Sequence, residues 1–206
     1  GLPTPAFEMI DSDSDLSSVI DRLGPVFVKP VSEGSSVGMS MASDADSLKQ
    51  ALLLASQSRV AIMAEAHIKG DEFTVAIVSG KALPPIKITP ASTFYDFDAK
   101  YVSGETRFEC PAPLSSSESE ALQTLALKAF EASGAKAWGR VDVMRDAEGW
   151  QLLEVNTIPG MTEHSLVPKA AAAAGLSFTD LLAEIYLASV VDGSPVCGPE
   201  EDRDGP

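Results

Sequence analysis

The stretch "LLEVNTIPGMTEHSLVP", residues 152–168, decides the fold of this chain. Its apolar start is typical of a β-strand, and a proline and a glycine end that strand. Because side chains alternate along a strand, Leu152, Glu154 and Asn156 are expected to share one face. A loop rich in hydroxyl groups follows. A carboxylate and a carboxamide at the end of a strand predict a polar site, whose nature depends on the strand opposite.

The strand opposite is predicted to be "WGRVDVM", residues 138–144, which leads into the turn "RDAEG". A three-residue loop over "AEG", with its glycine in a left-handed conformation, is a common hairpin connection. That register sets Asp142 opposite Glu154 and Arg140 opposite Asn156. Opposed residues on paired strands have Cβ atoms about 4.5–5.5 Å apart. The hairpin therefore gathers two carboxylates, an amide oxygen and a guanidinium.

This polar hairpin is open to two interpretations. Mg²⁺ takes oxygen ligands, usually one or two carboxylates together with substrate phosphates, and Asp142, Glu154 and Asn156 suit it. Like charges directly opposite each other destabilise a sheet. A cation bound between the two carboxylates would offset that repulsion. Acidic side chains are also common on solvated surface hairpins. The hairpin alone leaves both interpretations open.

Composition excludes several classes of partner. The chain has 206 residues and a formal net charge of −15, whereas a protein that binds nucleic acid needs a basic face. No apolar run approaches the roughly 18 residues of a membrane span, so no membrane partner is expected. Cys110 and Cys197 form neither a metal spacing nor a disulfide framework, which favours a reducing cytoplasm. The start at Gly1, in loop-like sequence, favours a missing upstream portion.

The order of predicted elements is mixed, with hairpins, and therefore favours an α+β class. Helices are predicted over residues 13–24, from Ser43 through Ala55, from a capping box of Ser117 and Glu120 to Gly134, and in two C-terminal segments, the second capped by Ser177. Strands are predicted over residues 25–30, 60–65, 73–78 and 83–88, with hairpin turns at 68–72 and 79–81. Residues 90–114 show no regular pattern, which is typical of a functional or disordered loop.

A second candidate site lies in "KPVSEGSSVGMS", residues 29–40. Lys29 ends a strand, and the glycines and serines that follow could turn several N–H and O–H donors onto an anion. The segment lacks the Gly-Lys-Ser/Thr of a Walker loop. Taken alone, a loop rich in glycine and serine is more often a simple turn. A single lysine such as Lys29 is more often a surface residue. Together with the acidic hairpin and the aromatic-rich loop, they indicate a nucleotide site.

Five segments in order carry a resemblance: "VKPVSEGSSVGMS", "EFTVAI", "FYDFDAKYVS", "WGRVDVM" and the opening stretch. From about Gly1 to about residue 190, the chain resembles the D-alanine–D-alanine ligases of the ATP-grasp superfamily. The resemblance implies an ATP-grasp fold, in which two α/β lobes with antiparallel sheets hold the nucleotide between them. It implies a small lobe over residues 1–84, a large lobe over 85–190 and a disordered acidic tail over 191–206. It also implies ATP, two Mg²⁺ ions (with Mn²⁺ as a substitute) and a homodimer.

The resemblance assigns roles position by position. The residues that match positions at the nucleotide phosphates are Lys29, Ser35, Ser36 and Lys100. Glu65 and Ile68 match positions at the adenine. Glu72 matches the acid that binds the ribose. Tyr101 matches the residue that closes the loop toward Ser35, and Asp142, Glu154 and Asn156 match the metal ligands. Arg140 and the N–H of Gly160 match the oxyanion stabilisers, and Ser165 and Leu166 the site for the carboxylate of the second D-alanine.

The implied activity is ATP-dependent ligation of two D-alanines through an acyl phosphate, a step of peptidoglycan precursor synthesis. Two departures qualify it. Ala66 and His67 stand where the family often has lysine after the adenine-site glutamate. The family's N-terminal domain has no counterpart, so the isolated chain is expected to be inactive, and a non-catalytic module that binds Mg·ATP is the alternative. A sibling ligase that takes D-lactate or D-serine is a third reading, which Lys100 and Tyr101 disfavour.

Overall fold

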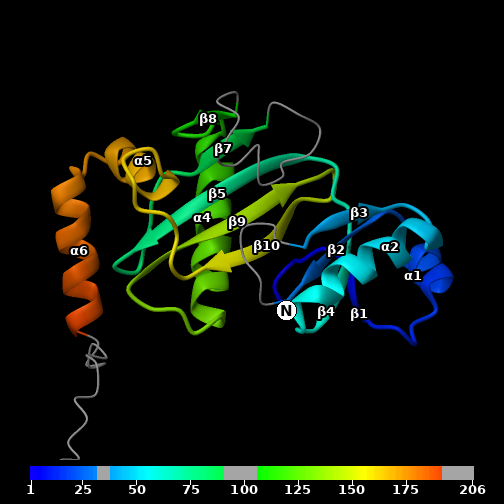
Figure 1. The fold of residues 1–206 in the computed structure, drawn as a ribbon. Helices are drawn as coiled ribbons and strands as arrows, with labels where there is room; N and C mark the ends of the chain where they lie inside the picture. The colour runs from blue at the N-terminus through cyan, green and yellow to red at the C-terminus, as the bar shows by residue number, and fades with distance from the viewer. Residues whose placement is uncertain (32–37, 91–105, 192–206) are drawn as a thin grey trace, which may run out of the picture.

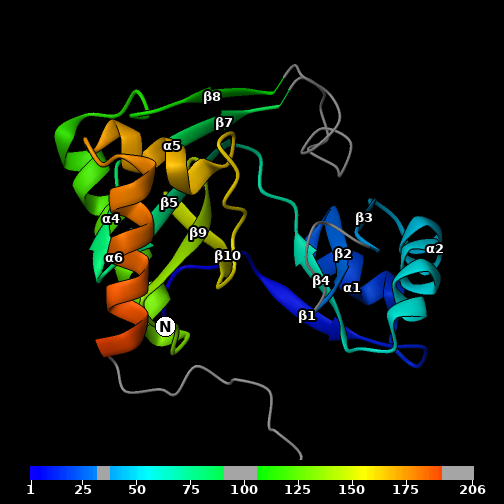
Figure 2. The same cartoon turned by 60° about the vertical axis from the view of Figure 1, so that its left-hand side comes forward.

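The computed structural model describes residues 1–31, 38–90 and 106–191. Within these ranges the chain forms two antiparallel sheets, each with helices packed on it (Figure 1, Figure 2). This arrangement confirms the predicted α+β class. Ser35, Ser36, Lys100, Tyr101 and the acidic tail from residue 192 onward lie outside the described residues.

The first sheet has the strand order β1-β4-β2-β3. Alternation along β2 places Val26 and Val28 in a core with α1 and α2, whereas Phe27 and Lys29 take the other face. The elements are β1 Phe7–Ile10, α1 Leu16–Leu23, β2 Val26–Pro30, β3 Ser40–Ala42, α2 Ala45–Ala55, the short 3₁₀ helix η1 Ser56–Ser58 and β4 Ile62–Ala66.

The second sheet is built around β5, which pairs with β9 on one side and with β6 and β7 on the other. The elements are β5 Asp71–Val78, β6 Lys81–Ala82, β7 Ile86–Thr89, β8 Arg107–Glu109, α4 Ser116–Ala132, β9 Trp138–Arg145, β10 Trp150–Asn156, α5 Leu166–Ala173 and α6 Phe178–Val191. The short strand β8 lies in the stretch 90–114, where no regular element was expected. It pairs with β7 and so adds an edge strand to the sheet.

Alternate residues of β5 serve the two faces of this sheet. Phe73, Val75 and Ile77 pack with α4, while Ala76 and Val78 pack with α5 and α6. The two faces of this sheet therefore have separate cores.

The two sheets divide between Ala66 and Asp71, where β4 ends and β5 begins. The predicted division at residue 84 assigns β5 and β6 to the first lobe, whereas both strands lie in the second sheet. The turn at residues 68–72 is likewise not a hairpin, because the strands on either side of it belong to different sheets. Pattern in the sequence marks the strands but not which sheet each one joins.

The chain also passes between the two sheets near its start, before β1. The N–H of Leu152 in β10 donates to the carbonyl of Pro3 at 2.9 Å, so the first residues lie along the second sheet before β1 enters the first. The N–H of Ala66 donates to the carbonyl of Ala6 at 2.8 Å. The two crossings therefore run side by side, joined by a backbone hydrogen bond.

Helix caps confirm one predicted boundary and change two others. α1 ends at Gly24 as predicted, with the glycine at a φ of 69°. α2 is capped by Asp44 rather than Ser43, because the carboxylate of Asp44 accepts from the N–H of Ser47 at 2.8 Å. α4 is capped by Ser115 with Glu118, two residues before the predicted capping box.

Glu118 joins this cap to the hairpin that carries the polar site. Its carboxylate accepts from the N–H of Ser115 at 2.9 Å and pairs with Arg145 at 2.6 Å. The hydrogen bonds from Ser115, and then that from Arg145, lower the pKa of Glu118 from 4.5 to about 2. Arg145 also lies over the ring of Trp150, 4.9 Å from its centroid.

Replacing Glu118 by glutamine is expected to lower Tm at neutral pH, because the neutral amide loses the charge-assisted bonds. The folded pKa lies below the unfolded one, so this contribution is present above pH 4.5 and is lost as the pH falls toward about 2. The measurement is Tm of both proteins across that range, with the exposed Glu120→Gln as control. A difference in Tm that persists unchanged at the acid end would contradict the assignment.

The described residues contain no single helix long and apolar enough to cross a membrane. α5 and α6 meet the length and composition test only as a pair, and they are bent by 106° where they join.

Candidate functional site

The hairpin of β9 and β10 has the predicted register at the polar site. Glu154 pairs with Asp142 and Asn156 pairs with Arg140. The connection nevertheless differs, because Trp150 pairs with Arg145 and four residues, not three, join the strands. A β-bulge between Leu152 and Glu154 then shifts the pairing by one residue, which restores the register at the site.

The bulge also changes which side chains share a face. Leu152 pairs with Val143 and is buried in the core beneath α4. Glu154, two residues later, pairs with Asp142 on the opposite face of the sheet. The prediction that Leu152 shares the face of Glu154 was therefore wrong. The extra residue lets one strand bury Leu152 on one face and present Glu154 and Asn156 on the other.

Asp142 is the centre of the site and is 6% exposed. Arg140 donates to it from two nitrogens, Nε to Oδ1 at 2.8 Å and Nη2 to Oδ2 at 2.7 Å. Asn156 Nδ2 donates to Oδ2 at 2.9 Å, and Thr74 Oγ1 donates to Oδ1 at 2.5 Å. A bidentate, largely buried ion pair with two further donors fixes the carboxylate tightly.

Thr74 is the residue that reasoning from the sequence missed. It lies in β5 directly opposite Asp142 and is buried. The signal was present, since "FTVAIV" carries one hydroxyl in an otherwise apolar strand. A buried hydroxyl needs a hydrogen-bond partner, so its presence there pointed to a polar neighbour.

Glu154 is the third side chain that could ligate a metal, and it is exposed. Asn156 Nδ2 lies 3.3 Å from its Oε1. No group of three or more histidine, cysteine, aspartate or glutamate side chains in the described ranges could hold a metal. The set here is two carboxylates and one amide, which fits Mg²⁺ if phosphates and water complete its shell. Asn156 now turns its amide nitrogen to both acids. It would have to rotate its side chain to offer oxygen to a cation.

Lys29 and Glu65 form a second group on the first sheet. Lys29 Nζ lies 2.8 Å from Glu65 Oε1, and Glu65 is buried. The ring of His67 meets that of Phe27 edge-on, with centroids 5.2 Å apart. Burial, and to a lesser degree Lys69, lowers the pKa of His67, so its imidazole is neutral at pH 7.

Two further predicted residues lie on or beside the crossing between the sheets. Ile68 is half-buried in the connection itself, and Glu72 lies in β5 opposite Met144. Gly70 approaches the end of β9 so closely that a Cβ there would sit 1.8 Å from the carbonyl oxygen of Arg145. The crossing is thus packed against the same hairpin that carries Asp142.

The loop after β10 brings Gly160 and Ser165 together. Ser165 precedes α5, and its Oγ accepts from the N–H of Thr162 at 2.9 Å. A Cβ at Gly160 would lie 3.0 Å from that Oγ, so the close approach favours glycine. Leu166 is the first residue of α5. The structure therefore places Gly160, Ser165 and Leu166 in one turn-and-helix unit.

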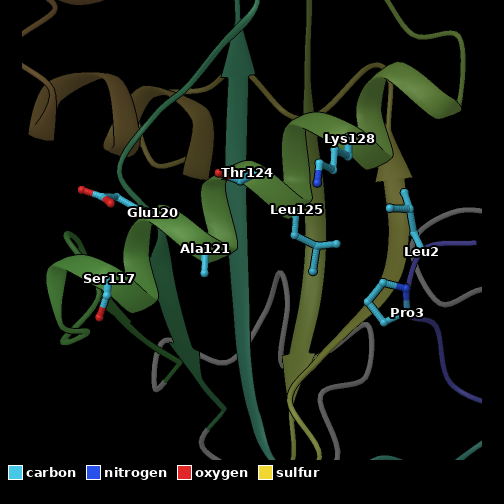
Figure 3. Close-up of a pocket in the computed structure, with 8 residues that line it drawn as sticks. All are labelled: Leu2, Pro3, Ser117, Glu120, Ala121, Thr124, Leu125 and Lys128. Carbon is cyan, nitrogen blue, oxygen red and sulfur yellow. The ribbon is translucent and has the colours of Figure 1, made fainter.

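A pocket of about 520 Å³ lies elsewhere, between α4 and the first residues of the chain (Figure 3). Its lining is Leu2, Pro3, Ser117, Glu120, Ala121, Thr124, Leu125 and Lys128. Because α4 covers the face of the sheet opposite Asp142, this pocket is separate from the polar site. We assign it no ligand.

The fold is shared with solved D-alanine–D-alanine ligases. The enzyme from Bacillus anthracis matches with a TM-score of 0.81 and 36% identity over 93% of this chain and 64% of that one. The same enzyme complexed with ATP matches with a TM-score of 0.78 and 34% identity, over 93% and 63%.

Sequence comparison leads to the same family. The family model described as D-ala D-ala ligase C-terminus matches residues 1–186, and the chain belongs to this family. A D-alanine–D-alanine ligase from Alcanivorax borkumensis is 49% identical over 195 residues, which cover 94% of this chain and 62% of that ligase. The chain therefore spans about three-fifths of the length of such a relative.

Proposed function

We propose that this chain is the ATP-binding and C-terminal part of a ligase that joins two D-alanines for peptidoglycan precursor synthesis in the cytoplasm. The observation that carries the proposal is the cluster of Arg140, Asp142, Glu154 and Asn156 on one face of the second sheet, in a chain of this family. The ATP complex of the Bacillus anthracis relative supports ATP as the nucleotide.

The nucleotide is proposed to lie between the two sheets, as in an ATP-grasp fold. Lys29 would contact its phosphates, Glu65 and Ile68 its adenine, and Glu72 its ribose. Ser35, Ser36, Lys100 and Tyr101 keep their predicted roles at the phosphates and in loop closure.

The reaction transfers the γ-phosphoryl group of ATP to the carboxylate of the first D-alanine and releases ADP. The amine of the second D-alanine then attacks the acyl phosphate, forms the amide bond and expels inorganic phosphate. Asp142, Glu154 and Asn156 would hold Mg²⁺ or Mn²⁺, which neutralises charge on the phosphate oxygens when bound. Arg140 and the N–H of Gly160 would stabilise the oxyanion of the tetrahedral intermediate.

The second D-alanine is proposed to bind at the start of α5, with its carboxylate at Ser165 and Leu166. D-serine or D-lactate would compete at this position in a sibling ligase. The first D-alanine is proposed to need residues from the part of the relatives that this chain does not span. The chain alone would then bind Mg·ATP without turnover, and a homodimer is proposed for the whole ligase.

Thermal unfolding with a non-hydrolysable ATP analogue tests the nucleotide site directly. At about 100 times Kd the analogue is expected to stabilise the fold by roughly 2.7 kcal/mol, about 5–10 °C in Tm. The shift should require Mg²⁺ and be lost in Glu154→Gln, whereas Glu131→Gln on α4 should keep it. A protein whose Tm ignores the analogue with Mg²⁺ present would refute the proposal.

A further inference from the structure

We infer that Thr74 is a positioning residue for Asp142, which holds one carboxylate oxygen in place so that the other can take a metal ion. The inference rests on the proposed function and deepens it. Thr74 lies in the middle of β5, is 1% exposed and pairs with Asp142 in the sheet register. No substrate contact is assigned to it.

The hydroxyl of Thr74 has one proton, and two acceptors are near it. Asp142 Oδ1 lies at 2.5 Å and the carbonyl oxygen of Val141 at 3.3 Å. The shorter contact is to the charged acceptor, where hydrogen bonds are stronger. The proton of Thr74 is therefore directed mainly at Oδ1, and Oδ2 is left to other partners.

A metal ion has to displace some of those partners. An ionised carboxylate offers about four lone-pair sites, and Asp142 accepts two hydrogen bonds from Arg140, one from Asn156 and one from Thr74. For a cation to reach Asp142, at least one of the donors must leave.

The three donors differ in how easily they can leave. The side chain of Arg140 is long and 18% exposed, and that of Asn156 can turn its amide over. Thr74 is β-branched and therefore stiff at χ1, and it is buried within the central strand. Arg140 and Asn156 can thus yield Oδ2 to a cation while Thr74 keeps Oδ1 fixed.

A valine would fill the same space as Thr74 in this apolar strand without any hydroxyl to satisfy. The hydroxyl is therefore explained by its partner rather than by packing. Groups that orient a metal ligand in this way typically change metal affinity by about 10–100-fold when they are removed.

The test compares Thr74→Val, which removes the hydroxyl at constant shape, with Thr74→Ser, which retains it. The control is Thr89→Val, the same change at an exposed position of β7. Free Mn²⁺ is titrated by electron paramagnetic resonance in the presence of the ATP analogue, and affinity for the analogue is measured separately without metal. The half-saturating Mn²⁺ concentration is expected to rise by about 10–100-fold in Thr74→Val. Thr74→Ser and Thr89→Val should stay near the wild type, and metal-free affinity should not change.

Three results would overturn the inference: a wild-type Mn²⁺ titration in Thr74→Val, equal losses in the valine and serine variants, or a parallel loss of metal-free affinity. The last would mark Thr74 as merely structural. If Thr74→Val does not fold, Thr74→Ala replaces it in the same comparison with serine. A wild-type chain that binds no Mn²⁺ with the analogue would overturn the proposed function itself, and the inference with it.

Discussion

Replacing Arg140 by methionine is expected to destabilise the chain by about 3–5 kcal/mol, because it leaves the carboxylate of Asp142 buried without its countercharge. Arg140 supplies two of the hydrogen bonds to Asp142, and the pair is largely shielded from water. Thr74 and Asn156 remain as donors, so the loss should fall at the lower end. Urea unfolding of both proteins measures it.

Arg107→Met is the matched control, since Arg107 pairs with Glu109 at 3.3 Å but is mostly exposed. Surface pairs of this kind contribute less than about 1 kcal/mol. Mg²⁺ should restore part of the stability of Arg140→Met, because a cation can replace the missing guanidinium. Equal losses in the two methionine variants would show that the Arg140 pair has no special weight.

Replacing Gly70 by alanine is expected to cost about 3 kcal/mol, since the new methyl group would overlap the backbone of β9. Its Cβ would lie 1.8 Å from the carbonyl oxygen of Arg145, and backbone cannot yield as the tip of a side chain can. Either the crossing or the end of β9 must move. The movement should also weaken binding of the ATP analogue, because Ile68 and Glu72 lie on each side of Gly70.

Lys69→Ala serves as control for Gly70→Ala, because Lys69 is the exposed neighbour in the same connection. Denaturant unfolding and analogue binding are measured for both. If Gly70→Ala retained wild-type stability and affinity, the crossing could not be packed against β9 as described.

The register of the polar hairpin was predictable, but the loop length and the β-bulge that produce it were not. Alternation and the turn signal placed Asp142 opposite Glu154, yet the prediction assumed a shorter loop and no bulge. Two differences of one residue compensated each other. A bulge has no strong signature in a single sequence, because it depends on how both strands pack against α4.

Contacts between distant strands were the hardest to predict. Thr74 is far from Asp142 in sequence, and only the pairing of β5 with β9 brings them together. The division of the sheets was missed for the same reason, since the strand pattern of residues 71–78 fits either sheet. The cap of α4 was displaced by two residues because several serines there are equally good candidates.

The paired crossings have a mechanical consequence. The two connections between the sheets lie side by side and are joined by the hydrogen bond from Ala66 to Ala6, so together they form one hinge. Two joined connections can bend together, but they oppose twisting and sliding of one sheet relative to the other. The first sheet is thus expected to rotate relative to the second about a single axis rather than freely.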